Sequence, residues 1–206
     1  MSKDYPVPAG SLECETEIKK SRFIARVAPV ASREDVRAVV EQAHRDHPDA
    51  RHVCWAYQIG RPGAAAEAAM NDDGEPSGTA GKPILNVIQH KDMGDVLVVV
   101  IRYFGGIKLG AGGLVRAYAS AAESVLSQVE RVVQPVMTRV DIELPFASEQ
   151  PVRHWCEHNG AEIGAVHYGA GLDGAGLTMA VQVSDTRLAD FLGFCAAEKI
   201  DCRTDS

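Results

Sequence analysis

The sequence VLVVVIRYFGGIKLGAGGLVRAY, residues 96–118, decides the fold of the larger part of this chain. It opens with six apolar residues, and such a run predicts a strand over Asp95 to Phe104 that is buried on both faces. Five glycines follow between residues 105 and 113 and predict a loop. From Leu114 to Val129 apolar residues recur at helical spacing. The stretch therefore predicts a buried strand, a glycine-rich loop and a long helix in succession.

The glycine-rich loop has the features of an anion-binding site. Glycine permits positive φ angles and lets backbone N–H groups approach a ligand. The first turn of the following helix adds unpaired N–H donors and a partial positive charge. Segment 102–118 holds three cations and no acid, in a chain of net charge −7. The alternative is a tight turn whose glycines serve packing alone. On the first interpretation the binding residues here are Arg102, Tyr103, Lys108, Gly110, Gly112, Gly113 and Arg116.

A second unusual stretch, NDDGEPSGTAGKP at residues 71–83, precedes the strand. Its carboxylates Asp72, Asp73 and Glu75 could hold Mg²⁺, which needs only one or two carboxylates besides substrate oxygens. The stretch is not a phosphate-binding P-loop, because proline stands at 76 in place of the first glycine and at 83 in place of the metal-binding Ser or Thr. The alternative is a capped surface loop without a ligand. The other polar side chains that could contact phosphate or a polypeptide are Ser77, Thr79 and Lys82.

Composition bounds the class of protein. The chain has 206 residues, of which 46% are apolar and 24% charged, and this is typical of a soluble globular protein. No apolar run approaches the 18 or so residues of a membrane helix, so no membrane contact is expected. Five cysteines with no CxxC pair indicate free thiols and a cytoplasmic location. Residues 1–134 carry a net charge of −1 and residues 135–206 one of −6, so any nucleic-acid contact is expected in the first part.

The remaining pattern predicts an α+β protein of two domains, 1–134 and 135–206, with the boundary at Pro135. In the first domain we expect a strand at Phe23–Val30, a helix that Ser32 caps and Pro48 ends, strands at Val53–Ile59 and 64–70, and a helix over Lys82–Gln89 capped by Thr79. In the second we expect strands at Val136–Leu144, Ala161–Tyr168 and Leu177–Val183, a helix that Ser148 caps and Asn159-Gly160 closes, and another that starts at Ser184. This β-α-β-β-α order predicts a small ferredoxin-like domain.

The two motifs, Asp72 to Ile84 and Arg102 to Tyr118, closely resemble those of the Impact/YigZ family. The upstream segments SRFIA at residues 21–25 and HVCWAY at residues 52–57 match as well. The resemblance covers about residues 11–130 strongly, and the remainder is similar to the C-terminal domain of the bacterial two-domain members. Neither motif departs from the family's pattern.

The resemblance implies a fold more than a reaction. The family's N-terminal domain is similar to the two-layer α/β sandwich of ribosomal proteins and of domain IV of elongation factor G, which GHMP kinases share. The C-terminal domain resembles the last domain of elongation factor G. Eukaryotic Impact proteins are translational regulators that compete for the activator of an initiation-factor-2 kinase. Bacteria lack that pathway, so this partner does not carry over, and the resemblance transfers no catalytic residue.

Two functions follow as hypotheses. The first is a non-enzymatic, translation-linked regulator that binds ribosomal RNA or a ribosome-associated protein without a cofactor, with Lys82, Arg102, Lys108 and Arg116 as the contacting cations. The second is an enzyme or sensor in which the glycine loop binds a nucleotide or phosphate and the acidic loop holds Mg²⁺. Kinship with GHMP kinases supports the second only by analogy of fold.

Overall fold

The computed structural model describes residues 4–169 and 176–204. The chain forms two compact units. One spans Tyr5–Gln134, and the other contains Asp4 and the part of the chain from Pro135 on. Each unit has its own apolar core, and each is described by itself below.

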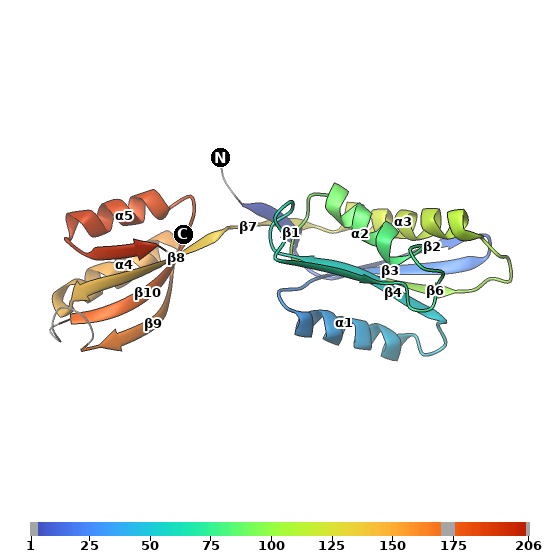
Figure 1. The fold of residues 1–206 in the computed structure, drawn as a ribbon, viewed down its shortest axis with the longest axis horizontal. Coiled ribbons are helices and arrows are strands. Elements are labelled where there is room, and N and C mark those ends of the chain that lie inside the picture. Colours follow the sequence, from blue (N-terminus) through green and yellow to red (C-terminus); the bar gives the residue numbers. More distant parts are fainter. Residues whose placement is uncertain (1–3, 170–175, 205–206) are drawn as a thin grey trace. The chain divides into compact units, whose positions relative to one another are not determined.

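The first unit is built on a five-stranded antiparallel sheet in the order β2-β3-β6-β4-β5. Helix α1 covers one face, while α2 and α3 cover the other (Figure 1). The expectation of two layers is therefore wrong for this unit, which has three, because α1 buries a second face of the sheet. The elements are β2 Leu12–Ile18, β3 Ser21–Pro29, α1 Arg33–Asp46, β4 His52–Ile59, β5 Glu67–Asn71, α2 Gly81–His90, β6 Val96–Tyr103 and α3 Ala111–Gln128.

The central strand β6 explains this arrangement. Residues 96–101 are all fully buried. Because successive side chains of a strand point to opposite faces, Val96, Val98 and Val100 join the core under α2 and α3. Leu97, Val99 and Ile101 join the core under α1. The prediction of a strand buried on both faces is confirmed.

Local sequence signals set the helix ends. Ser32 caps α1, with its Oγ accepting from the Asp35 N–H at 3.2 Å, as predicted. The prediction that Thr79 caps α2 is wrong, because its hydroxyl donates to the Pro76 carbonyl at 2.6 Å. The free N–H groups of that helix bond instead to the carboxylate of Asp72. The first residue of α3 is Ala111, so Gly112 and Gly113 belong to the helix and not to the loop.

Three strands near the ends of this unit carry weak sequence signals. In β2, Glu13, Glu15 and Glu17 alternate outward, so few apolar residues mark the strand. Strands β1 Tyr5–Pro8 and β7 Arg131–Gln134 pair only with each other, in an antiparallel two-stranded sheet.

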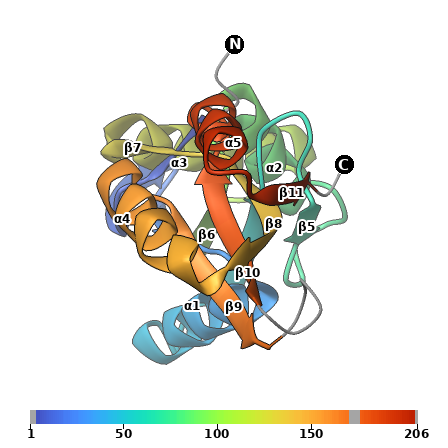
Figure 2. The ribbon, with the colours of Figure 1, turned by 90° about the vertical axis from the view of Figure 1, so that its left-hand side faces the viewer.

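The second unit is an antiparallel sheet in the order β11-β8-β10-β9 that packs with α4 and α5 around a single core (Figure 2). Its elements are β8 Met137–Pro145, the short helix η1 Phe146–Ser148, α4 Glu149–Asn159, β9 Glu162–Tyr168, β10 Gly176–Ser184, α5 Leu188–Ala197 and β11 Asp201–Thr204. Strand β11 completes the β-α-β-β-α-β order of a ferredoxin-like unit. Helix α5 begins at Leu188 and not at Ser184, because β10 continues to that serine. Of the helices in the described residues, none is long and apolar enough to cross a membrane.

Candidate anion-binding site

A cavity of about 360 Å³ lies where the two sequence motifs meet. The acidic loop contributes Glu75, the end of β6 contributes Arg102 and Phe104, and the glycine-rich loop contributes Lys108 and Gly110. The start of β4 completes the wall with Arg51 and His52. These segments meet because β4 pairs with β6, which places His52 in β4 opposite Arg102 in β6. The fold thus brings both motifs to one end of the sheet.

A buried ion pair forms the floor of this cavity. Nη1 of Arg102 donates to Oε1 of Glu75 at 2.5 Å, and the two side chains are 7% and 4% exposed. The hydroxyl of Tyr118 donates to the same oxygen at 2.8 Å. Unlike a free cation, Arg102 therefore has its charge matched by Glu75. This pairing makes the floor nearly neutral and leaves the electrostatics of the cavity to its rim.

Two aromatic rings flank the Arg102 guanidinium. Its central carbon lies 5.6 Å from the ring centroid of Phe23 and 5.7 Å from that of Phe104. These distances are within the range of cation–π attraction. Phe23 is fully buried, whereas the Phe104 side chain is 45% exposed. Nε of Arg102 is buried and has no hydrogen-bond partner among the described residues. The cavity thus has one partly exposed aromatic ring and one buried donor that lacks a partner among the described residues.

Among the described residues, the positive charge at the rim has no acidic partner. Helix α3 begins there after Gly110, whose φ of 71° favours glycine, and no side chain caps its first turn. The first intrahelical bond runs from the Leu114 N–H to the Gly110 carbonyl, so the three N–H groups before Leu114 precede the helix's own hydrogen bonds. There is no acid in that turn. Lys108 and Arg51 add two exposed cations. The geometry suits an anion.

Close packing requires glycine where β6 leaves the sheet. A Cβ on Gly105 would lie 1.9 Å from the carbonyl oxygen of Lys20, so any larger residue would displace the backbone between β2 and β3. The Gly105 N–H also donates to Oγ of Ser21 at 3.2 Å. The glycine loop therefore serves packing at this position, whereas Gly110 has a positive φ and open space where a Cβ would stand.

Asp72 organises the acidic loop. Its Oδ1 accepts from the N–H groups of Ala80 at 3.0 Å and Gly81 at 2.8 Å, and its Oδ2 accepts from Gly78 at 2.7 Å. Partial burial by itself would raise the pKa of Asp72, but the three backbone donors outweigh it and hold the pKa below its usual range. Asp72 is thus the side-chain cap of α2.

Replacing Asp72 with alanine should lower the free energy of unfolding by about 1–2 kcal/mol at neutral pH, because it removes the cap of α2. Since the folded-state pKa is lowered, the stabilisation exists above the unfolded-state pKa and is lost as pH falls through the folded-state value. Urea unfolding from pH 7 to pH 2 should show the difference between variant and parent vanishing in acid. Asp49→Ala, at an exposed position, is the control. A difference that persists at the acid end would contradict this role.

The structure does not bring the predicted Mg²⁺ ligands Asp72, Asp73 and Glu75 together. Both oxygens of Asp72 face backbone donors, and Oδ2 of Asp73 accepts from the Val53 N–H at 2.6 Å. Glu75 is paired with Arg102. Within residues 4–169 and 176–204, these three carboxylates do not form a metal-binding cluster.

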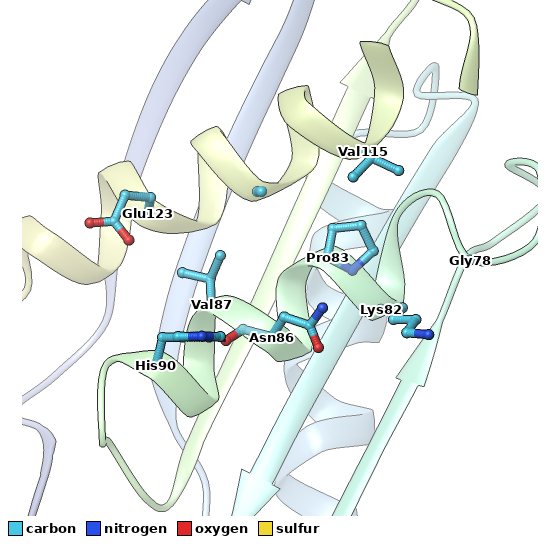
Figure 3. Close-up of a pocket in the computed structure, with 9 residues that line it drawn as sticks. Gly78, Lys82, Pro83, Asn86, Val87, His90, Val115 and Glu123 are labelled. Carbon is cyan, nitrogen blue, oxygen red and sulfur yellow. The ribbon is translucent and has the colours of Figure 1, made fainter. Parts of the chain in front are cut away.

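The other predicted binding residues separate into several places. Of these, Arg102, Lys108 and Gly110 line the cavity, and Gly112 and Gly113 lie in the adjoining first turn of α3. Lys82 lies in a different groove, of about 470 Å³, between α2 and α3 (Figure 3). Ser77 and Arg116 are exposed and line neither hollow, and Thr79 is buried.

Tyr103 lies on the opposite face of the sheet from the cavity. Its hydroxyl is 3.0 Å from Nδ1 of His47, and the guanidinium of Arg22 stands 5.2 Å from its ring centroid. It packs with the core under α1. Because adjacent residues of a strand alternate in direction, Tyr103 cannot share a ligand with Arg102.

Sequence reasoning missed Arg51, His52 and Phe104 as lining residues. Arg51 precedes β4 and His52 is its first residue, and the sequence does not show that β4 pairs with β6. Nδ1 of His52 is 2.8 Å from the carbonyl of Asp73, and a carbonyl can only accept, so this nitrogen donates. The sequence pattern placed Phe104 at the end of the buried strand, whereas β6 ends at Tyr103 and Phe104 is 45% exposed.

Comparison with known proteins gives the chain's relationships. The model of the Impact N-terminal domain matches residues 19–126. An Impact family member of Haemophilus influenzae is 40% identical over 160 residues, which cover 78% of this chain and 78% of that protein. The Impact family member YigZ of Escherichia coli is 40% identical over 144 residues, 70% of this chain and 71% of its own. A crystal structure described as that of a hypothetical protein is 30% identical, with a TM-score of 0.84 over 100% of this chain and 98% of that one. On the matched domain and these identities, the chain belongs to the Impact family.

Proposed function

We propose that this protein is a non-enzymatic, translation-linked regulator that binds a single-stranded segment of ribosomal RNA at the 360 Å³ cavity. The observation that carries the proposal is the combination of an uncapped helix N-terminus, unmatched rim cations and an exposed aromatic face in one hollow. Each of these three features matches one part of a nucleotide.

The charge balance of the cavity favours phosphate. The one acid in its lining, Glu75, is neutralised by Arg102. The positive charges of Lys108, Arg51 and the N-terminus of α3 therefore have no acid beside them in the cavity. The chain as a whole has a net charge of −7, so this local excess of positive charge runs against the composition. A phosphate at the first turn of α3 would accept backbone N–H bonds and face both cations.

The exposed ring favours an unpaired base. Phe104 has the Arg102 guanidinium near it and is 45% exposed, which leaves ring surface for stacking. Base–aromatic stacking is how proteins hold splayed-out RNA bases, and it is worth about 1–3 kcal/mol per base. A double-stranded segment keeps its bases stacked within the helix, so the ring supports a single strand.

The link to translation rests on the family. The resemblance to the Impact family implies a role in translation, and this chain carries both of the family's motifs at the cavity. The absence of a carboxylate ligand set in the acidic loop, among the described residues, gives no support to a Mg²⁺-dependent reaction there.

Salt dependence tests the phosphate contacts. We expect Lys108→Ala and Arg51→Ala each to weaken binding to single-stranded ribosomal RNA fragments and to lower the slope of log K against log salt by about 0.7. Fluorescence anisotropy across a salt series measures both quantities. The matched control is Arg37→Ala, an exposed arginine on α1 at the other face of the sheet.

Phe104→Ala should behave differently, with binding weakened by about 1–3 kcal/mol and the salt slope unchanged. Unchanged RNA affinity in all three cavity variants would refute the proposed site. Ribosome co-sedimentation that survives without RNA affinity would favour a ribosome-associated protein instead. A rise in melting temperature that requires both a nucleotide and Mg²⁺ would favour an enzyme or sensor.

A further inference from the structure

A second cluster of ligand-type side chains lies on helix α4 of the second unit. His154, Glu157 and His158 are all exposed, and their ligand atoms lie within 4.8 Å of one another. We propose that these three residues bind one divalent transition-metal ion of the zinc class through two imidazole nitrogens and one carboxylate oxygen. This site is separate from the cavity of the first unit and does not depend on the function proposed for it.

Helical spacing creates the site. Residues four apart lie one turn above each other on the same face of an α-helix, so His154 and His158 project side by side. Their ring centroids are 4.0 Å apart, with an angle of 47° between the planes. Two imidazoles in this position can both reach one ion without a change in the backbone. Glu157 stands next to them on the same turn and supplies the negative charge.

A backbone hydrogen bond prepares His158 as a ligand. Its Nδ1 is 2.9 Å from the carbonyl oxygen of His154. A carbonyl can only accept, so Nδ1 carries the proton and donates. In neutral imidazole the other nitrogen, Nε2, then holds the lone pair. Metal-binding histidines are commonly oriented in this way by a bond from their second nitrogen.

Neighbouring groups on α4 do not compete for the cluster. The guanidinium of Arg153 is held by Glu149, one turn toward the helix start, at 2.8 Å. The amide of Asn159 donates to the Trp155 carbonyl at 2.8 Å. Among the described residues Glu157 has neither an ion-pair nor a hydrogen-bond partner. Its carboxylate is therefore free to turn toward an ion at the two histidines.

The donor set selects the type of metal. Two imidazole nitrogens and one carboxylate oxygen suit Zn²⁺, Ni²⁺ or Cu²⁺, whereas Mg²⁺ and Ca²⁺ prefer oxygen alone. Cys156 adds no thiolate, because it is 1% exposed and packs into the core of the unit. Three protein ligands leave at least one coordination position open to water. Because all three ligands are exposed, the bound ion would exchange with solvent while linking the side chains of the last turn of α4.

Calorimetric titration of the tag-free, full-length protein with Zn²⁺ tests the proposal. We expect one ion per chain, with the affinity reduced at least tenfold in His154→Ala and in His158→Ala, and less in Glu157→Gln. His167→Ala, an exposed histidine on β9 of the same unit, is the matched control and should bind as the parent does. All four positions are exposed, so circular dichroism should show the same fold in every variant.

Cu²⁺ gives an independent readout of the ligands. Electron paramagnetic resonance should show two nitrogen ligands in the parent and one in either histidine variant. Bound Cu²⁺ should also quench Trp155, which lies on the same helix, more than Trp55 in the other unit. No Zn²⁺ binding by the parent, or equal binding by the parent and both histidine variants, would overturn the proposal.

Discussion

Glu75→Ala is expected to lower the free energy of unfolding by about 3–5 kcal/mol, because it leaves the Arg102 guanidinium buried without its counter-charge. Nη1 of Arg102 lies 2.5 Å from Oε1 of Glu75, and both side chains are less than a tenth exposed. The hydroxyl of Tyr118 loses its acceptor at the same time. Urea unfolding followed by circular dichroism at 222 nm in the far-ultraviolet, a general probe of helix, measures the loss.

The exposed ion pair between Arg22 and Glu15 is the matched control. Its atoms are 2.8 Å apart, but the side chains are 49% and 47% exposed. Water already solvates both groups, so Glu15→Ala should change stability far less than Glu75→Ala does. The double variant Glu75→Ala with Arg102→Met should recover much of the loss, since it removes the unpaired charge together with its partner. Equal losses in the Glu75 and Glu15 variants would show that burial does not determine how much an ion pair contributes to stability.

Phe191→Ala is expected to destabilise the second unit by about 3–5 kcal/mol through the loss of a fully buried ring. The ring of Phe191 lies 4.8 Å, centroid to centroid, from that of Trp155. Trp155 belongs to this unit and Trp55 to the other. In a Trp55→Phe background, tryptophan fluorescence during urea unfolding therefore reports on the second unit alone.

The control for this prediction is Phe146→Ala. The Phe146 side chain is 50% exposed and stacks only loosely on Tyr168, at 6.5 Å between ring centroids. Its removal should change the urea midpoint of unfolding of the second unit little, as is usual for surface substitutions. A Phe191 variant as stable as the Phe146 variant would mean that the second unit does not depend on this core.

Much of the fold follows from local patterns. The apolar run over residues 96–101 of β6 predicted a strand buried on both faces, because both sets of alternating side chains in that run are apolar. The signal of Ser32 followed by Asp35 predicted the start of α1, and Gly160, with a φ of 66°, ends α4 where predicted. Such signals are readable because caps, turns and periodicity depend on residues only a few positions apart.

For other elements, the neighbouring sequence gives little indication of the structure. Strand β11 has four residues and an exposed, charged sequence, and it exists because β8 offers it an edge. Helix α2 has no cap at the expected position, because its cap comes from Asp72. The third layer of the first unit could not be read from the sequence either. The pattern of α1 shows one apolar face but not which face of the sheet it covers.

For the candidate site, the sequence by itself determined the glycine-rich loop, the cations near it and the absence of acids between residues 102 and 118. Only the tertiary structure decided that Glu75 neutralises Arg102 and that Arg51 joins the rim. It also decided that Tyr103 lies on the far side of the sheet. The physical reason is distance along the chain. Loop and helix ends are set by neighbouring residues, whereas a charge is free or matched according to which strands pair across the sheet.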